Sequence, residues 1–430
     1  MAFLLIAAFP ACSPQVVAVD INVQLFSDDA PLAQEGITIV LSDAGGNVTF
    51  GAVTDASGTA AFKVNPGSYT ASATFKSAED GKLITLNGSN TNIDVTGQSG
   101  EKFLLILQKV EIRQLIIKEF YTGGCPKNDN SGAFTDDKYI IIYNNSEVEA
   151  DASDVVIGAI SPYNANASNK YFTKDGLVYE NDSWLPAGGV VWYFTSPVKI
   201  PAYSQIVVAV FGAIDHTATV TASVNLANPD YYWMSNADIP AITNAKYVVS
   251  DVIPPSHYLS GYQINRQNAW TISNTAPALF MAIMGKSELE ALCTNTADYD
   301  LTAGTNDISW AVKMPKANII GALEVYAAAS LEACHPRFSS DVNTGHIVMT
   351  GQLGYTIYRN VDKEATEALP ENEGKLVYNY SGGTEDVGGT TDPSGIDAEA
   401  SIAAGAHIIY LQTNDSGKDY HQRRIASLKQ

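Results

Sequence analysis

In "RQLIIKEFYTGG" (113–124) and "DDKYIIIYNNSEVEADASDVVIG" (136–158), short apolar runs rich in Ile, Val and Tyr end at Gly, Asn and Asp. β-Branched and aromatic residues suit a pleated strand, and Gly, Asn and Asp suit the turns between strands. The first run carries one acidic residue, Glu119, and the second runs into the Tyr-Asn-Asn-Ser of 143–146. The two stretches therefore predict consecutive strands of an all-β domain.

These residues resemble the opening of the lamin-tail domain, an immunoglobulin-like β-sandwich. The sequence departs from that family at Ile141, where the family usually has an acidic residue. Later fragments resemble the strands and terminal turn of the same family, in the same order: "KIPAYSQIVVAV" (199–210), "APALFMAIMG" (277–286), "GYTIYRN" (354–360) and "QTNDSGKDYH" (412–421). We therefore expect a lamin-tail-like domain over 111–430, enlarged by an inserted lobe at about 160–275 that the short family module lacks.

A first β-domain is expected over 16–110, where apolar and polar residues alternate and turn residues recur at short intervals. The string "TDASGTAAFKVNPGSYT" (54–70) resembles the prealbumin-like modules of carboxypeptidase-regulatory and surface-adhesin domains. We expect Asp55 to order the turn, Gly58 to adopt its left-handed conformation and Phe62 to face the core. The predicted fold class is thus all-β, with consecutive prealbumin-like and immunoglobulin-like β-sandwiches.

The start of the chain, "MAFLLIAAFPAC" (1–12), is an apolar run with a small residue directly before Cys12. It resembles the lipobox of bacterial lipoproteins, which implies that residues 1–15 are a signal and tether and that Cys12 is lipidated. The run lacks the basic residues that normally open a signal peptide. The alternative is an N-terminal strand with an incidental cysteine. After Cys12, no apolar run approaches the ~18–20 residues of a membrane-spanning helix.

The charge balance excludes two classes of partner. The chain has 46 acidic and 25 basic residues, a formal net charge of −21. Such a field repels phosphate backbones and anionic lipid headgroups, so we expect neither nucleic-acid binding nor electrostatic adsorption to a membrane. Hydrophobic residues make up 46% of the chain, which argues for a folded protein rather than a disordered one.

The sequence indicates no metal site, cofactor or known catalytic motif. The six histidines are scattered without metal-ligand spacing, and the chain contains no Gly-x-Ser-x-Gly, phosphate loop, His-Glu-x-x-His or dinucleotide fingerprint. Apart from Cys12, three cysteines remain. Cys293 and Cys334 are candidates for a disulfide in an oxidising compartment, and Cys125 lies in a loop-like stretch. A short helix is expected at 287–295, where Ser287 would be the N-cap, and another at 364–369.

Aromatic residues among turn residues are the candidate ligand contacts, because such rings stack on sugar faces or dock protein surfaces. All of them fall within the expected lobe: Tyr231, Tyr232, Trp233, Trp184, Tyr258, Tyr262 and Trp270. The alternative is that these rings fill a sandwich core, as we expect for Trp192 inside an alternating strand.

Taken whole, the chain resembles an uncharacterised family of Bacteroidota outer-membrane lipoproteins, whose members commonly accompany TonB-dependent transporters. This resemblance implies a non-catalytic, lipid-anchored surface protein that captures a nutrient, glycan or partner protein beside a transporter. Two alternatives remain: a structural or adhesive surface protein, and an extracellular glycan hydrolase. The hydrolase would use a carboxylate pair such as Glu119 with Asp136 or Asp137, because sugar hydrolysis needs two carboxylates ~5–10 Å apart.

Overall fold

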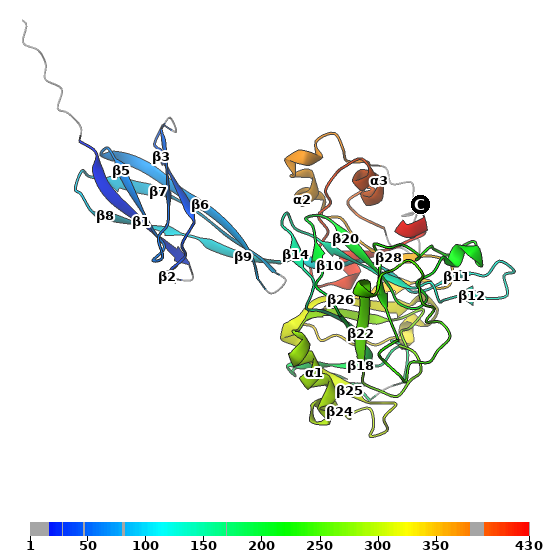
Figure 1. Ribbon diagram of the computed structural model, residues 1–430. Coiled ribbons are helices and arrows are strands. Elements are labelled where there is room, and N and C mark those ends of the chain that lie inside the picture. Colours follow the sequence, from blue (N-terminus) through cyan, green and yellow to red (C-terminus); the bar gives the residue numbers. More distant parts are fainter. Residues whose placement is uncertain are drawn as a thin grey trace, which may run out of the picture. The chain divides into compact units, whose positions relative to one another are not determined.

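The computed structural model describes residues 17–27, 29–45, 48–79, 82–168, 170–378 and 391–429. The chain divides into two compact units, Met1–Ile112 and Arg113–Gln430 (Figure 1). Strands dominate both units, which confirms the predicted all-β class. Among the residues described, no helix is both long and apolar enough to cross a membrane.

Unit 1 consists of two sheets that enclose one apolar core. In the first sheet, β1 lies between antiparallel β2 and β5 and also pairs in parallel with β8. The second sheet has the order β4-β3-β6-β7-β9. The strands are β1 (Val19–Ser27), β2 (Ala30–Pro31), β3 (Thr38–Asp43), β4 (Thr49–Val53), β5 (Thr59–Val64), β6 (Gly67–Glu79), β7 (Lys82–Val95), β8 (Glu101–Ile106) and β9 (Gln108–Arg113). Alternate residues of β1, such as Ile21 and Val23, are fully buried.

The turn before β5 has the local chemistry that the sequence predicts. Asp55 Oδ1 accepts hydrogen bonds from the backbone N–H groups of Ser57 (2.9 Å) and Thr59 (3.1 Å) and from the Ser57 hydroxyl (2.6 Å). These bonds, that of the Ser57 hydroxyl above all, hold the pKa of Asp55 below its usual value. Gly58 has φ +77°, and a Cβ there would lie 1.8 Å from the carbonyl oxygen of Leu32, so only glycine fits. Phe62 is buried, as expected.

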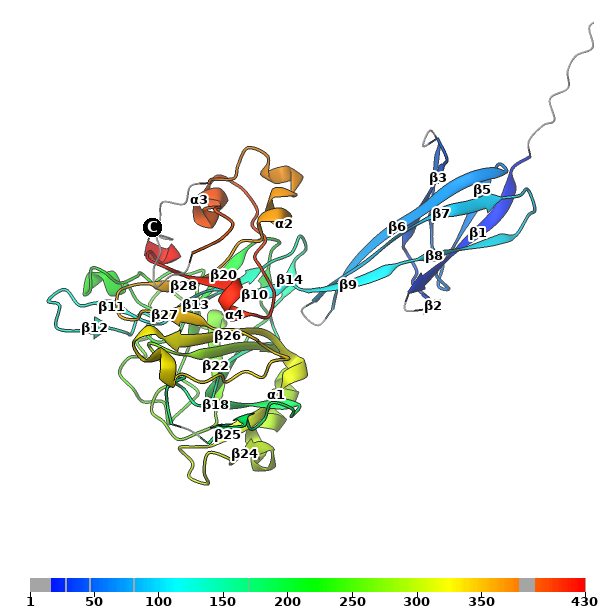
Figure 2. The same ribbon diagram turned by 180° about the vertical axis from the view of Figure 1, so that it is seen from behind.

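Unit 2 is built on one 14-stranded sheet (Figures 1 and 2). In sheet order its strands are β27 (Ile347–Met349), β26 (Ile319–Ala327), β23 (Ala278–Ile283), β15 (Val155–Ile160), β18 (Trp184–Phe194), β22 (Tyr258–Gln263), β21 (Tyr232–Met234), β20 (Gln205–Ala209), β13 (Tyr139–Asn144), β10 (Leu115–Tyr121), β28 (Thr356–Arg359) and β29 (Tyr420–Arg423). β25 (Ala311–Pro315) also pairs with β18, and β24 (Tyr299–Asp300) pairs with β25.

The two edges of this sheet approach each other. The side-chain amide of Gln422, in β29, accepts from the backbone N–H of Thr350 (3.0 Å) and donates to its carbonyl oxygen (2.8 Å), and Thr350 directly follows β27. The sheet therefore curls almost into a barrel, whose inner face forms the largest apolar core.

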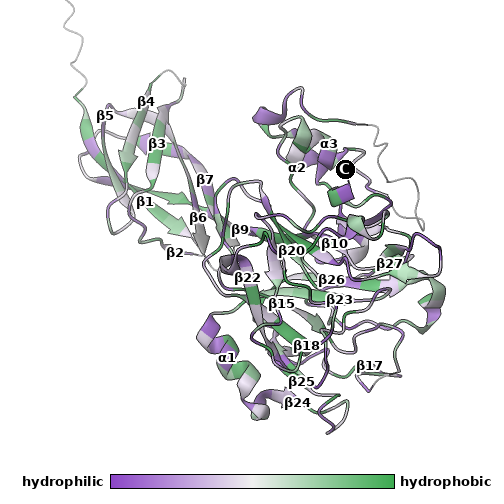
Figure 3. Cartoon of the chain, turned by 45° about the vertical axis from the view of Figure 1, so that its right-hand side comes forward, coloured by the Kyte–Doolittle hydropathy of each residue, from purple (hydrophilic) through white to green (hydrophobic). Residues whose placement is uncertain are grey.

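Both faces of the sheet are covered, which explains why every residue of β10, β13 and β15 is buried. A second apolar cluster, which includes Phe280 and Val191, lies against β15, β18 and β23. A third cluster packs residues of the segment 361–410, such as Ile408 and Tyr410, on β10, β13 and β28. Figure 3 shows hydrophobic stretches along strands such as β18. A sheet buried on two faces reads in sequence as continuous apolar runs, as in the opening stretches.

Residues 160–275 do not form a separate lobe. They contribute β18, β20, β21 and β22 to the middle of the sheet, between β15 and β13. These strands pair directly with those of the quoted stretches, for example Ile141 with Val207. The strands of the quoted stretches and the residues between them therefore share one hydrophobic core.

Helices are short. The two predicted ones are present as α1 (Lys286–Thr294) and α2 (Lys363–Glu367), but the expected cap is wrong: Gly285 occupies the N-cap of α1, and Ser287 lies inside the first turn. The others are α3 (Ala398–Ala403), α4 (Ser416–Asp419) and the 3₁₀ turns His216–Ala218, Pro255–His257, Thr296–Asp298, Lys316–Asn318, Ala328–Ala333, Pro370–Asn372 and Ser427–Lys429. The described part of unit 2 also has three small ribbons: β11 (Cys125–Pro126) with β12 (Ala133–Phe134), β14 (Ala150–Asp151) with β19 (Lys199–Ile200), and β16 (Phe172–Thr173) with β17 (Gly176–Leu177).

Candidate functional site

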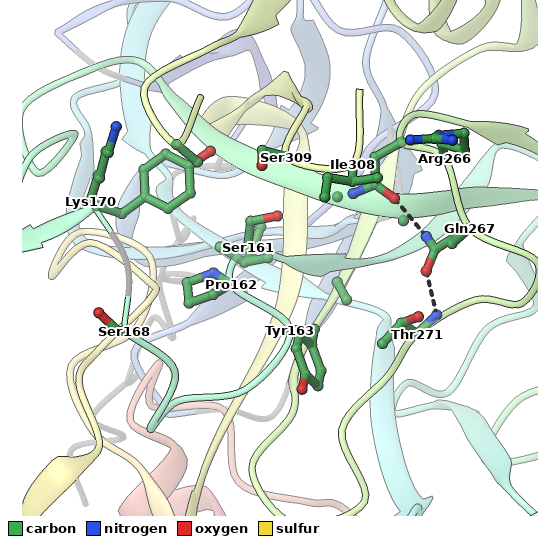
Figure 4. A pocket seen from close by; sticks show the side chains of 17 residues that line it. Ser161, Pro162, Tyr163, Ser168, Lys170, Arg266, Gln267, Thr271, Ile308 and Ser309 are labelled. Atoms are coloured by element: carbon green, nitrogen blue, oxygen red, sulfur yellow. Dashed lines mark hydrogen bonds between the residues drawn. The ribbon is translucent and has the colours of Figure 1, made fainter. Parts of the chain in front are cut away.

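A pocket of about 590 Å³ opens in unit 2 beside the end of β15 and the middle of β18. Its volume lies within the ~300–1,000 Å³ that is usual for small-ligand sites. The walls come from the segment after β15, the loop that follows β22 and the loop before β25 (Figure 4). We call this hollow the first pocket.

Two glycines in β18 make room for the first pocket. The pairing of β15 with β18 shifts register between Ile157 and Ala159, opposite this part of β18. A Cβ at Gly188 would lie 2.2 Å from Ser161 Oγ, and one at Gly189, where φ is +78°, would lie 2.8 Å from Trp270 Cδ1. Side chains at these positions would fill the floor, so the glycines keep the strand open to a ligand.

A network of carboxamides forms one wall (Figure 4). Gln267 Nε2 donates to Asn265 Oδ1 (2.8 Å), and Gln267 Oε1 accepts from the backbone N–H of Thr271 (2.9 Å). Asn265 Nδ2 donates to the carbonyl oxygen of Trp310 (3.2 Å). These bonds fix which end of each amide is the donor and hold the groups in place before a ligand arrives.

The rim carries an aromatic ring and two cations. Tyr163 is 52% exposed, an unusual state for a large aromatic side chain. It follows the cis Ser161–Pro162 bond, and the carbonyl oxygen of Pro162 accepts from Arg337 Nη1 (3.2 Å). The charged residues in the lining are Lys170 and Arg266, and Arg266 also pairs with Asp307 (3.0 Å). Together the ring, amides and cations suit a ligand rich in hydrogen-bond acceptors.

Two of the predicted ligand contacts are almost wholly buried in the core; the prediction is wrong for Trp233, whereas Trp270 also lines a second hollow, described below. Trp233 and Trp270 are each 1% exposed. The Trp233 indole donates to the carbonyl oxygen of Phe211 and packs edge-on against Tyr258 at 4.9 Å between ring centroids. Trp270 packs against Trp192, itself buried as expected. Both rings face the interior of the curled sheet, where burial of a large apolar surface outweighs exposure to a ligand.

The other predicted aromatics are half-buried and do not gather at one place. Tyr231, Tyr232 and Tyr258 pack on the core inside the sheet, whereas Trp184 and Tyr262 pack on the cluster outside it. None of these five lines the first pocket, although the loop that follows Tyr262 supplies its carboxamides. Sequence reasoning missed Tyr163, for which the available signal was a Ser-Pro-Tyr turn among asparagines.

The carboxylates of the hydrolase alternative serve other purposes. Glu119 is fully buried and accepts from the Tyr139 hydroxyl (2.6 Å) and from the backbone N–H (3.1 Å) and hydroxyl of Ser427. Asp137 is also fully buried, and Asp136 forms an ion pair with Lys246 (2.7 Å). The two buried carboxylates are closed off from a substrate by the side chains that bind them. In the part of the chain that the structure describes, no group of acidic, histidine or cysteine side chains is arranged to hold a metal ion.

The expected disulfide is not formed. Cys293 and Cys334 are both free, buried thiols, because they pack in different apolar clusters. Cys125 is also free and buried, and its thiol contacts Asp137 Oδ2 at 3.5 Å rather than lying in an open loop. Burial, with Asp137 acting in the same direction, raises the pKa of Cys125 to about 11. Cys12, the expected lipidation site, lies outside the described residues.

No protein-family model and no curated protein matches the sequence. Among solved structures, the chain is similar to a DUF4876 family protein from Bacteroides thetaiotaomicron VPI-5482, at 14% identity and a TM-score of 0.55, over 94% of each chain. A DUF3823 family protein from Parabacteroides merdae ATCC 43184 is matched at 9% identity over 45% of this chain and 80% of that one, with a TM-score of only 0.16. The first likeness shows that this chain shares the fold of an uncharacterised Bacteroides protein over nearly its whole length.

Proposed function

We propose that this chain is a lipid-anchored, cell-surface binding protein that captures a glycan in the first pocket. The observation that carries the proposal is the pocket itself: preformed, of small-ligand size, with a half-exposed tyrosine at its rim and oriented carboxamides in its wall. A tyrosine ring stacks on the apolar face of a sugar, and carboxamides bond to its hydroxyl groups as donors and acceptors.

The anchor and the setting belong to the same proposal. A lipid on Cys12 would hold the protein at the outer membrane of a bacterium of the Bacteroidota, where a TonB-dependent transporter would take up the captured ligand. The lipobox-like residues 1–12 and the fold shared with a Bacteroides protein support this setting. Metabolic labelling with a fatty-acid probe should mark the wild-type chain and not the Cys12→Ala variant. A wild-type chain without label would remove the anchor from the proposal.

Binding of the full chain to a glycan array, followed by calorimetry on the best ligand, tests the capture site. Tyr163→Ala should weaken binding about tenfold, because an aromatic stacking contact contributes ~1–1.5 kcal/mol. Tyr378→Ala is the matched control, since Tyr378 is also exposed (43%) but lies outside the first pocket. Equal affinities of the wild type and the Tyr163 variant for every bound glycan would show that this pocket is not the capture site.

A further inference from the structure

A second pocket, of about 450 Å³, lies next to the first. Tyr163 and Thr271 line both hollows, so the exposed ring of Tyr163 stands between them. A ligand that stacks on this ring therefore meets one pocket on each side, as two subsites of one groove. An extended chain of sugars fits such a groove better than a single small molecule does.

Three asparagines that line the second pocket each have the side-chain oxygen engaged by a hydrogen-bond donor. Asn274 Oδ1 accepts from Lys138 Nζ (2.6 Å), Asn244 Oδ1 from the backbone N–H of Lys246 (3.1 Å), and Asn164 Oδ1 from a serine hydroxyl (2.9 Å). Because each oxygen is engaged, each Nδ2 faces away from these partners. Among the described residues, these Nδ2 groups donate no hydrogen bond. The second pocket therefore presents a set of ready donors, which suit an acceptor-rich group.

The charges of the two linings have one sign. The basic side chains in the lining of the second pocket are Lys138 and Lys246, and those of the first are Lys170 and Arg266. The charged residues of the two linings are thus all basic, although the chain as a whole has 46 acidic and 25 basic residues. Lys246 forms an ion pair with Asp136 (2.7 Å), and Arg266 forms one with Asp307. These two carboxylates, which do not line the pockets, neutralise part of the positive charge.

Lys138 acts on the second pocket through Asn274. Its ammonium group is buried and donates to the carbonyl and hydroxyl oxygens of Thr122 as well as to Asn274 Oδ1. An ammonium donor on the oxygen of an amide polarises that amide and strengthens its N–H groups as donors. In its protonated form, Lys138 is thus a positioning residue that prepares Asn274 for a negatively charged group.

We propose that the groove binds an acidic oligosaccharide, with one sugar ring stacked on Tyr163 and a carboxylate or sulfate of the neighbouring unit in the second pocket. The inference rests on the proposed function and narrows its ligand class. Nδ2 groups of three asparagines with Lys246 beside them form the kind of charge-assisted donor set that binds carboxylate and sulfate oxygens.

The test compares matched ligands on the full chain by calorimetry. One pair is tetragalacturonate and the same tetrasaccharide with its carboxyl groups reduced; the other is a carrageenan tetrasaccharide and its desulfated form. We expect the acidic member of at least one pair to bind at least tenfold tighter, and the difference to shrink as the salt concentration rises. The pair that shows the difference identifies the acidic group.

Two variants assign that difference to the second pocket. Asn244→Asp keeps the shape and the acceptor for the Lys246 N–H but adds a negative charge, so it should abolish the preference for acid while neutral binding persists. Lys246→Met should reduce the preference, whereas Lys313→Met, on β25 and outside both pockets, should not. If a neutral glycan binds but no acidic ligand binds more tightly than its neutral partner, the proposal of an acidic ligand is wrong, whereas the proposal of glycan capture still holds. If no glycan on the array binds, both proposals fall.

Discussion

At the scale of single residues, unit 2 buries more charge than its sequence suggests. Arg337 and Glu324 are 1% and 2% exposed and form an ion pair in which Arg337 Nε (2.9 Å) and Nη2 (2.5 Å) both donate to Glu324 Oε1. Arg337 also donates to the carbonyl oxygens of Pro162 and Ala276. The pair thus fixes the turn that carries Tyr163, and its desolvation is offset by a full set of hydrogen bonds.

The buried ammonium of Lys138 should make stability depend on pH. Burial lowers its pKa to about 7 in the folded chain, against the opposing influence of Asp137 and Asp136 and together with that of Lys246. Between pH 7 and 10.5 the unfolded chain therefore binds more protons at this residue, so the folded state gains stability as the pH rises. We expect the free energy of unfolding of the wild type, minus that of Lys138→Met, to rise by roughly 2–3 kcal/mol from pH 6.5 to 9.

Urea unfolding followed by tryptophan emission at several pH values measures this difference. Lys199→Met is the control, since the bond to Asp151 raises the pKa of Lys199 and moves its titration above this range. The control should keep the pH dependence of the wild type. A wild-type slope identical to that of the Lys138 variant would mean that Lys138 is charged throughout the range.

The candidate residues show where sequence reasoning stops at this scale. The sequence predicts ligand contacts from aromatic rings near turn residues, but a ring in a turn-rich stretch can face either the core or the solvent. Trp233 faces the core because β21 is inserted between two central strands, a pairing that depends on residues far away in the sequence. Tyr163 is exposed in the segment that follows the end of β15. Neither outcome is encoded in the residues next to the ring.

At the scale of elements, strands with clear alternation were predictable and strand partners were not. The run 19–26 predicts β1 to within one residue. By contrast, the apolar run 102–110 reads as one strand, yet the chain passes from one sheet to the other at Leu107, so that β8 pairs with β1 and β9 joins the second sheet. The periodicity of a strand reports its faces and carries no information on its neighbours.

The glycine pair in β18 should be essential to the first pocket. Gly189→Ala combines a left-handed φ of +78° with a Cβ only 2.8 Å from buried Trp270. Gly405→Ala is the matched control, because its φ is +85° but nothing lies within 4 Å of the added Cβ. The control should cost about 1–2 kcal/mol of unfolding free energy from backbone strain alone. Gly189→Ala should cost at least ~1 kcal/mol more from overpacking, and should also weaken glycan binding.

Urea unfolding and calorimetry on both variants separate the two effects. If the two substitutions proved equally costly, the contact between position 189 and Trp270 would not constrain the fold. If Gly189→Ala lowered stability but left glycan affinity unchanged, the floor of the first pocket would not touch the ligand.

At the scale of the whole molecule, the closure of the unit 2 sheet was the least predictable feature. Its edges meet through Gln422 and Thr350, which lie 72 residues apart in the sequence. The sequence indicates strands and turns for such a sheet, but its curl depends on many weakly specified pairings at once. The predicted inserted lobe shows the same limit, since its strands could be recognised one by one and their place in the central sheet could not.

Each unit has an apolar core of its own, which predicts that a defect in one unit leaves the other intact. All five tryptophans belong to unit 2, so tryptophan emission reports on that unit alone, whereas far-ultraviolet circular dichroism reports on both.

Gly58→Ala places a Cβ 1.8 Å from a backbone oxygen in unit 1. In the full chain it should shift part of the dichroism transition to lower urea, while the midpoint of the emission transition stays unchanged. Gly189→Ala should move the emission midpoint. If Gly58→Ala moved the emission midpoint as well, the two units would unfold as one cooperative body.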